Sequence, residues 1–295
     1  MRNKRIVLFT LCTTICALPS CTGFGNSSSG SVNEYAPVFS ADGKTVKYGY
    51  YPQTHVNDSL LIKDLNEIET SESNGLYILD GTYYAKKTFV MDPSSSLVFD
   101  DGTKIVTGNT CWFRCEPIKW DILESKNEGV YSLISSVLLD AHRYDDFSNN
   151  YKDSEIREWL NGTFYDTAFS LNDSFVQTVT VDNSASTTDS SGNGYVCEDT
   201  QDKVYLLSYQ DYKNTDYFPE DAKDCKTKTT DWARANGAYY GTDSPYLYNG
   251  WYWSRSPNSD YSHMVWGVSG GDGLYYGAVD ISCFCARPAI TIKVS

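Results

Sequence analysis

The chain has 295 residues, with 24 Lys and Arg against 38 Asp and Glu, and a formal net charge of -14 at pH 7. Hydrophobic residues make up 41% and aromatic residues 15%, including 24 Tyr and 7 Trp, which is typical of a folded globular protein. The acidic balance argues against nucleic acid and anionic lipid surfaces as partners, because both need a basic surface on the protein.

The first 20 residues have the order of a signal peptide, with basic residues followed by an apolar stretch over 6–17. This stretch is shorter than the roughly 18–20 residues of a membrane-spanning helix. Leu18-Pro-Ser-Cys21 resembles the bacterial lipobox, with Pro19 as a departure, and the resemblance implies two acyl chains on Cys21. We expect an extracytoplasmic protein, lipid-anchored to the bacterial cell membrane; an ordinary secretory signal is the alternative.

Residues 21–39 are expected to be the lipidated cysteine and a flexible tether, because 22–33 are small and polar. Removal of residues 1–20 takes away three basic residues and no acid, which leaves 21 basic against 38 acidic residues, a net charge of -17. Residues 40–295 contain no repeat and no break in composition, so we expect a single domain there.

Apolar alternation predicts short antiparallel strands. Ile118, Trp120 and Ile122 fall on one face of a strand, and residues 130–135 are predicted to be its hairpin partner. Gly270-Gly-Asp-Gly273 is expected to be a hairpin turn. Further strands are predicted at Tyr48–Tyr51, Lys203–Leu207, Trp251–Ser254, Met264–Val268, Leu274–Asp280 and Ala289–Val294.

Two short helices are predicted among these strands, which makes the fold class α+β. Asp153–Gly162 has an Asp or Ser N-cap, apolar residues at helical spacing, and Gly162 as its stop. Thr229–Gly237 has the same form.

Six cysteines follow Cys21, an even number that permits disulfides in an exported chain. Cys197 and Cys225 are the best candidate pair, because their bridge would close a loop over the strand predicted near 202–208. No spacing of Cys and His predicts a zinc site. We expect no cofactor, although calcium at the acidic loop 182–194 stays open despite the lack of an EF-hand pattern.

Six sequence blocks occur in order along the chain: Lys47–Thr54, Glu116–Leu123, Ser154–Asn161 with Phe164–Phe169, Asp202–Ser208, Trp251–Pro257 and Ala286–Ala289. Together they resemble a family of exported bacterial proteins known as domain of unknown function 6273. Ser254 and Cys285-Ala286 depart from the usual residues of the family, and residues 57–115 are an insertion between the first two blocks. The order of the blocks is also similar to the C-type-lectin-like fold of formylglycine-generating enzymes and bacterial surface binders, which implies a lectin-like core.

Aromatic and small polar residues are concentrated between residues 246 and 284. Rigid rings supply contact area at low entropy cost and polar side chains supply hydrogen bonds, which is typical of binding loops and also suits sugar rings. We expect a surface for a glycan or protein ligand made of Tyr246, Tyr248, Tyr261, His263, Asp272, Tyr275, Tyr276 and Asp280. Structural roles are expected for Trp120, Trp159, Trp253, Arg255 and Arg287.

The sequence therefore favours a surface-anchored lipoprotein with a non-catalytic binding domain. It contains no Gly-x-Ser-x-Gly, His-Glu-x-x-His or phosphate-binding glycine motif, and we assign no catalytic residue. The alternatives are an extracytoplasmic enzyme that acts on glycans or proteins, and a structural envelope protein.

Overall fold

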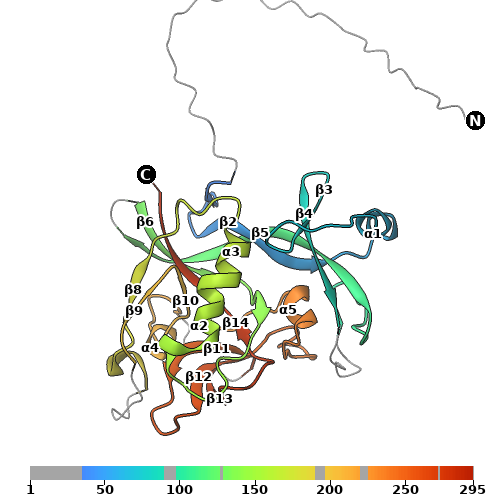
Figure 1. Cartoon of the computed structure of the whole chain (residues 1–295). Coiled ribbons are helices and arrows are strands. Elements are labelled where there is room, and N and C mark those ends of the chain that lie inside the picture. Colours follow the sequence, from blue (N-terminus) through green and yellow to red (C-terminus); the bar gives the residue numbers. More distant parts are fainter. Residues whose placement is uncertain are drawn as a thin grey trace, which may run out of the picture. The chain divides into compact units, whose positions relative to one another are not determined.

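The computed structural model describes residues 35–89, 98–126, 129–189, 197–219, 225–271 and 273–294 (Figure 1). The predicted signal peptide, the lipidation site Cys21 and the ligand-surface residue Asp272 lie outside these ranges. Tyr35–Ser295 forms one compact unit of mixed α+β architecture. In the ranges described, no helix has both the length and the apolar character needed to cross a membrane.

The larger sheet has eight strands. Six strands follow one another in the order β1 (Val38–Phe39), β2 (Thr45–His55), β5 (Thr110–Lys126), β6 (Val130–Ser135), β15 (Ala289–Lys293) and β10 (Val204–Tyr205). The other two strands form a branch, in which β4 (Thr82–Thr88) pairs with β5 and also with β3 (Tyr77–Leu79). The predicted β5–β6 hairpin is confirmed, with Trp120 opposite Ser135. Since β1 pairs with β2, the folded part begins inside the segment expected to be a tether.

The smaller sheet has five strands and lies at the bottom of Figure 1. Its order is β13 (Gly273–Ala278), β12 (Met264–Ser269), β11 (Tyr252–Pro257), β14 (Cys285–Ala286) and β7 (Asp140–Ala141). The β12–β13 hairpin and its glycine-rich turn are as predicted. The prediction of antiparallel strands is wrong for β11 and β14, which run parallel because the whole β12–β13 hairpin separates them in the chain. A two-stranded sheet pairs β8 (Val179–Val181) with β9 (Thr200–Asp202).

The central helix is longer than predicted. It consists of α2 (Glu155–Trp159), the π-helical segment η3 (Leu160–Phe164) and α3 (Tyr165–Ala168), after the 3-10 turn η2 (Tyr151–Asp153). The Ser154 hydroxyl caps it as expected, but Gly162 does not end it. Leu160 and Phe164 are fully buried on either side of Gly162, and their burial outweighs the roughly 1 kcal/mol that a glycine costs in a helix.

The number of helices also differs from the prediction of two. α5 (Asp231–Ala235) is confirmed, with Thr230 as its cap. The two helices that were not predicted are α1 (Ser59–Asn66), which Asp58 caps, and α4 (Tyr209–Tyr212), and a 3-10 turn η4 (Ala185–Thr187) adds one more short element. α4 is too short to show a hydrophobic period, so its capping box was its main signal in the sequence.

The main hydrophobic cluster joins the central helix to both sheets. Fully buried members come from β5 (Trp120), the helix (Phe164) and β11 (Trp253). The ring of Tyr51 on β2 lies 4.9 Å from that of Phe164, and the Trp120 indole donates to the Tyr48 carbonyl at 2.7 Å.

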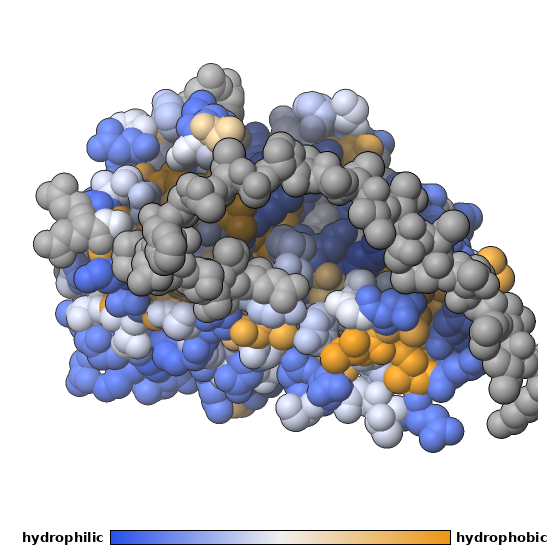
Figure 2. Space-filling model, turned by 90° about the horizontal axis from the view of Figure 1, so that it is seen from above, coloured by the Kyte–Doolittle hydropathy of each residue, from blue (hydrophilic) through white to orange (hydrophobic). Residues whose placement is uncertain are grey.

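The face of the molecule seen in Figure 2 is largely hydrophilic where it is coloured. The most apparent group of hydrophobic residues on this face lies at the lower right of the view.

The insertion 57–115 packs on the rest of the fold through α5. The buried Asp231 carboxylate accepts the main-chain N–H of His55 at 2.9 Å and that of Asp100 at 2.8 Å, and it also pairs with Arg234. Trp232 packs against clusters from both parts of the chain. α5 therefore joins the insertion to the main fold, in addition to the pairing of β4 with β5 in the larger sheet.

The predicted disulfide between Cys197 and Cys225 is not formed. Cys197 is a half-buried free thiol that packs against the main cluster, whereas Cys225 is buried in a second cluster with Tyr212 and Tyr252. Packing assigns the two side chains to different clusters, which spacing in the sequence could not show.

Gly49 should resist substitution. It has a φ of +71°, and a Cβ there would lie 2.8 Å from both the Ala168 carbonyl oxygen and the Phe169 ring. We expect Gly49→Ala to lower the free energy of unfolding by about 2–5 kcal/mol. Gly43→Ala, at a φ of +68° with nothing within 4 Å, should cost only about 1–2 kcal/mol. Equal losses in urea unfolding would contradict the close approach at Gly49.

Asp140 should make stability depend on pH. Its buried carboxylate accepts hydrogen bonds from the Tyr51 hydroxyl at 2.7 Å and the Trp232 indole at 2.9 Å, and burial raises its pKa. The folded state thus retains this proton at pH values where the unfolded chain has released it, so stability falls as the pH rises past about 4. Urea titrations at several pH values measure the free energy of unfolding of the wild type and of Asp140→Asn. As the pH rises past about 4, the wild type should lose stability relative to the variant. A difference in free energy between the two proteins that is constant with pH would refute the assignment.

Candidate ligand surface

Aromatic rings follow one another across the β12–β13 hairpin and the segments beside it. Successive ring centroids lie 5.9, 5.2, 5.4, 6.5 and 6.2 Å apart along the series Tyr239, Trp251, Tyr275, Tyr276, Tyr261 and His263. We call these six residues the ring ladder. Distances of this size are those of favourable aromatic pairs, so the rings support one another as a continuous surface.

The ring ladder is open to solvent. The side chains of its four tyrosines are between 37% and 55% exposed, although large aromatic residues usually bury most of their surface. His263 is exposed and Trp251 is half-buried against Phe284. Exposed apolar area that is contiguous rather than scattered marks an interaction surface.

Tyr275 and Tyr276 owe their exposure to the position of β13. Neighbouring residues of a strand point to opposite faces of a sheet, yet these two rings stack with an angle of only 6° between their planes. β13 is the outer strand of the smaller sheet, so no strand on its outer side covers these two rings in the described part of the chain. Opposite Tyr275 on β12 is Gly267, where a Cβ would lie 2.4 Å from the Tyr252 carbonyl oxygen.

The loop that carries Tyr261 and His263 is held by Asn149. The buried Asn149 amide nitrogen lies 3.0 Å from the main-chain oxygens of both Tyr261 and Met264 and 3.3 Å from that of Asn258. The Asn149 main-chain N–H donates to Ser262 at 3.1 Å. These bonds tie residues 258–263 to the segment 145–149.

That segment adds an exposed ring that sequence reasoning missed. Phe147 is 85% exposed, and the Asp145 carboxylate accepts the main-chain N–H groups of Phe147 and Ser148, each at 2.9 Å. The N–H of Asp145 in turn donates to the Val279 carbonyl beyond β13. Phe147 stands alone between polar residues, so its exposure could not be predicted from a periodic pattern in the sequence.

Two of the predicted ligand residues, Tyr246 and Tyr248, lie outside the ring ladder. Tyr246 is exposed near Gly271, with the Lys226 ammonium 5.0 Å from its ring. Tyr248 is half-buried, and the Arg234 guanidinium lies 4.5 Å from its ring, which gives Tyr248 a packing contact. Asp272 lies outside the described residues.

The remaining predicted ligand residues come together. Tyr261, His263, Tyr275 and Tyr276 belong to the ring ladder, and Asp280 is exposed just beyond the end of β13. Tyr239 and Trp251 were not predicted to take part. Alternation along a strand does not show which side of a sheet edge stays open, so it gave no sign that Trp251 takes part.

The two arginines expected to be structural are buried. Arg255 donates to the carbonyl of Leu206 at 2.9 Å and to that of Asp182 at 3.0 Å. Arg287 donates to the carbonyls of Ser135 and Cys225, both at 2.9 Å. Their guanidinium groups therefore hold distant chain segments together, as the structural roles predicted for them require.

The three tryptophans expected to be structural differ in burial. Trp120 and Trp253 are fully buried in the main cluster. Trp159 is half-buried, and its ring stacks on His142 at 4.9 Å. The Trp253 indole donates to the His142 carbonyl at 2.8 Å, which connects the two.

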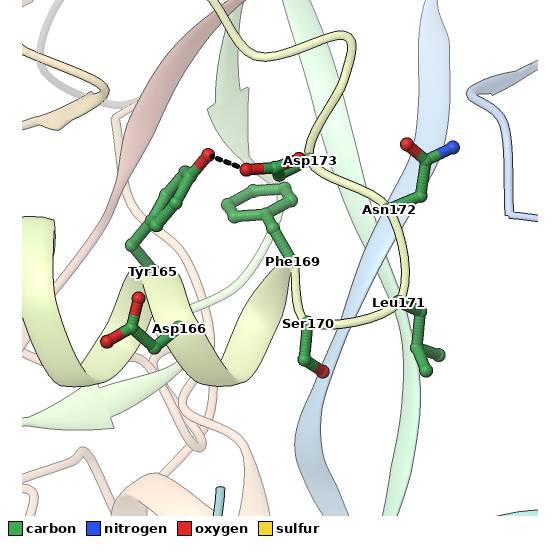
Figure 3. Close-up of a pocket in the computed structure, with 7 residues that line it drawn as sticks. All are labelled: Tyr165, Asp166, Phe169, Ser170, Leu171, Asn172 and Asp173. Atoms are coloured by element: carbon green, nitrogen blue, oxygen red, sulfur yellow. Dashed lines mark hydrogen bonds between the residues drawn. The ribbon is translucent and has the colours of Figure 1, made fainter.

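A separate polar pocket of about 470 Å³ lies at the end of α3 and in the loop that follows (Figure 3). The Tyr165 hydroxyl donates to Asp173 at 3.0 Å and accepts from the Lys203 ammonium at 3.0 Å. Burial raises the pKa of Tyr165, so this hydroxyl keeps its proton to a higher pH than an exposed tyrosine does. Figure 3 shows Tyr165 and Asp173 turned toward each other, while Leu171 and Asn172 point away.

A smaller pocket of about 210 Å³ lies where β2 meets the insertion, lined by residues that include Thr54, His55, Arg114 and Glu116. The His55 Nδ1 lies 2.8 Å from the Asp101 carboxylate. Over the described ranges, no group of three or more His, Cys, Asp or Glu side chains is placed to hold a metal ion. Part of the acidic loop 182–194 lies outside those ranges, so the calcium alternative is not tested there.

Loss of the Asn149 amide should free the loop of the ring ladder. We expect Asn149→Ala to lower the free energy of unfolding by about 1–3 kcal/mol, because main-chain oxygens lose a buried donor. Amide hydrogen exchange should accelerate at residues 258–264 and stay unchanged in the β6–β15 pair. Unchanged exchange at 258–264 would show that Asn149 does not hold this loop.

Comparison with known proteins gives one match. The family model described as Domain of unknown function (DUF6273) matches residues 128–294, which include the whole ring ladder and Asn149. The two most N-terminal of the six sequence blocks and the insertion 57–115 precede the matched range. No curated protein and no solved structure matches the chain. From the extent of the family match, the chain belongs to the DUF6273 family.

Proposed function

We propose that the chain is a non-catalytic binding protein that holds a glycan or protein ligand on the ring ladder. The observation that carries this proposal is the continuity of exposed rings from Tyr239 to His263 on a rigid hairpin and a fixed loop. Aromatic residues with few rotatable bonds lose little entropy on binding, and they dominate the energy of binding surfaces.

The surroundings of the ring ladder suit a polar ligand with apolar faces. Asp260 and Asp280 are exposed next to it and offer carboxylate oxygens to hydroxyl or N–H groups. The ring faces offer contact to the C–H groups of a sugar or to the side chains of a protein. Because the loop of Tyr261 is held by buried hydrogen bonds, a ligand would not have to order it.

The proposal also covers location and fold. The order of residues 1–21 supports export and a lipid anchor on Cys21, which would present the ring ladder outside the cytoplasm. The small sheet with its long hairpin and the separate central helix support a C-type-lectin-like core. We propose both on these grounds.

An array of glycans and host proteins, probed with the full chain with and without calcium, tests the function. We expect specific binding that falls by at least about tenfold in the double variant Tyr275→Ala, Tyr276→Ala, because aromatic anchors typically contribute 2 kcal/mol or more.

Tyr83→Ala is the control, since it removes a ring from β4 in the other sheet. Its binding should equal that of the wild type. Absence of binding by the folded wild type, or equal binding by the double variant, would reject the ring ladder and favour an enzyme or a structural envelope protein.

A further inference from the structure

β13 is an unusually long edge strand for this molecule. The other outer strands in the described part of the chain have two or three residues: β1, β10, β3, β7, β8 and β9. β13 has six, and β12 is the one strand with which it pairs among the described residues. Its outer side is thus an extended row of main-chain groups to which another strand could be added.

The sequence of β13 does not protect this edge. Natural proteins cover or shorten edge strands, or place Lys, Pro or a bulge in them, to prevent pairing with other chains. Gly273–Ala278 reads Gly-Leu-Tyr-Tyr-Gly-Ala, with no charge and no proline, and its pairing with β12 is regular over all six residues. An open edge of this kind is the receptor in recognition by strand addition.

The charges near β13 differ between its two ends. Beyond Ala278 lie the exposed carboxylates of Asp280 and, on the adjoining loop, Asp260, and neither forms an ion pair with another described residue. At the turn end, one acid, Asp272, precedes Gly273 in the sequence, and one base is present, because the ammonium of Lys226 lies over the Tyr246 ring. A segment that pairs antiparallel with β13, as β12 does, would have its N-terminal end beside the two aspartates.

We propose that β13 binds an extended peptide segment of a partner protein by antiparallel strand addition, with basic residues at the N-terminal end of that segment beside Asp260 and Asp280. This proposal rests on the proposed function, because it names the ligand class of the ring ladder. Main-chain hydrogen bonds hold the segment, and Tyr275 and Tyr276 contact its side chains from the strand edge.

Three synthetic peptides test the proposal on the full chain by calorimetry. The first has an alternating Thr-Val hexamer preceded by two lysines; the second has two glutamates in place of the lysines; the third is the lysine peptide N-methylated at alternate residues on its pairing edge. We expect the lysine peptide to bind about tenfold more tightly than the glutamate peptide at low salt, and the N-methylated peptide not to bind.

The variant Asp260→Lys, Asp280→Lys keeps the edge and both tyrosines and should reverse the preference in favour of the glutamate peptide. Failure of the lysine peptide to bind, equal binding of all three peptides, or an unchanged preference in the variant would overturn strand addition. Glycan binding on the array that is lost in the Tyr275→Ala, Tyr276→Ala variant would still support the ring ladder, so the two proposals fail separately.

Discussion

The buried side chain of Asn149 is the contact on which the loop of the ring ladder depends. Its amide nitrogen lies within 3.3 Å of three main-chain oxygens in and beside residues 258–263, which have no strand partner of their own. The main-chain N–H of Val279 also donates to the His263 carbonyl at 3.0 Å, so the Asn149 side chain and this bond together place Tyr261 and His263. β13 supplies two more rings, because its place at the sheet edge leaves Tyr275 and Tyr276 exposed.

The ring ladder and the residues that support it come from the same part of the chain. The ring ladder and Asn149 lie within the part that matches the family, as do the buried Arg255 and Arg287 that hold distant chain segments together. The insertion 57–115 precedes that part, and it is attached through Asp231 on α5 and through the pairing of β4 with β5. It also reaches the segment beside the ring ladder, because the Tyr240 hydroxyl accepts the main-chain N–H of Val98 at 2.8 Å.

Local patterns predicted much of the fold, and contacts between distant residues account for the errors. Alternation around Trp120 predicted the β5–β6 hairpin, because each of these strands buries one face and its apolar residues therefore alternate. Alternation could not show that Gly162 lies inside a helix, because that depends on the burial of Phe164. It also could not show that Cys197 and Cys225 pack in different clusters. Composition found Tyr261, Tyr275 and Tyr276, but it missed Tyr239 and Phe147, whose exposure depends on which segments fold beside them.

Protection of individual tyrosines from nitration by a bound ligand tests the ring ladder most directly. With a ligand that binds the full chain at saturation, mass spectrometry should show slower nitration of Tyr239, Tyr261, Tyr275 and Tyr276. Tyr83 in the other sheet should react at the same rate with and without ligand. Protection at Tyr83, or unchanged rates at all four tyrosines of the ring ladder, would place the ligand elsewhere and contradict the account.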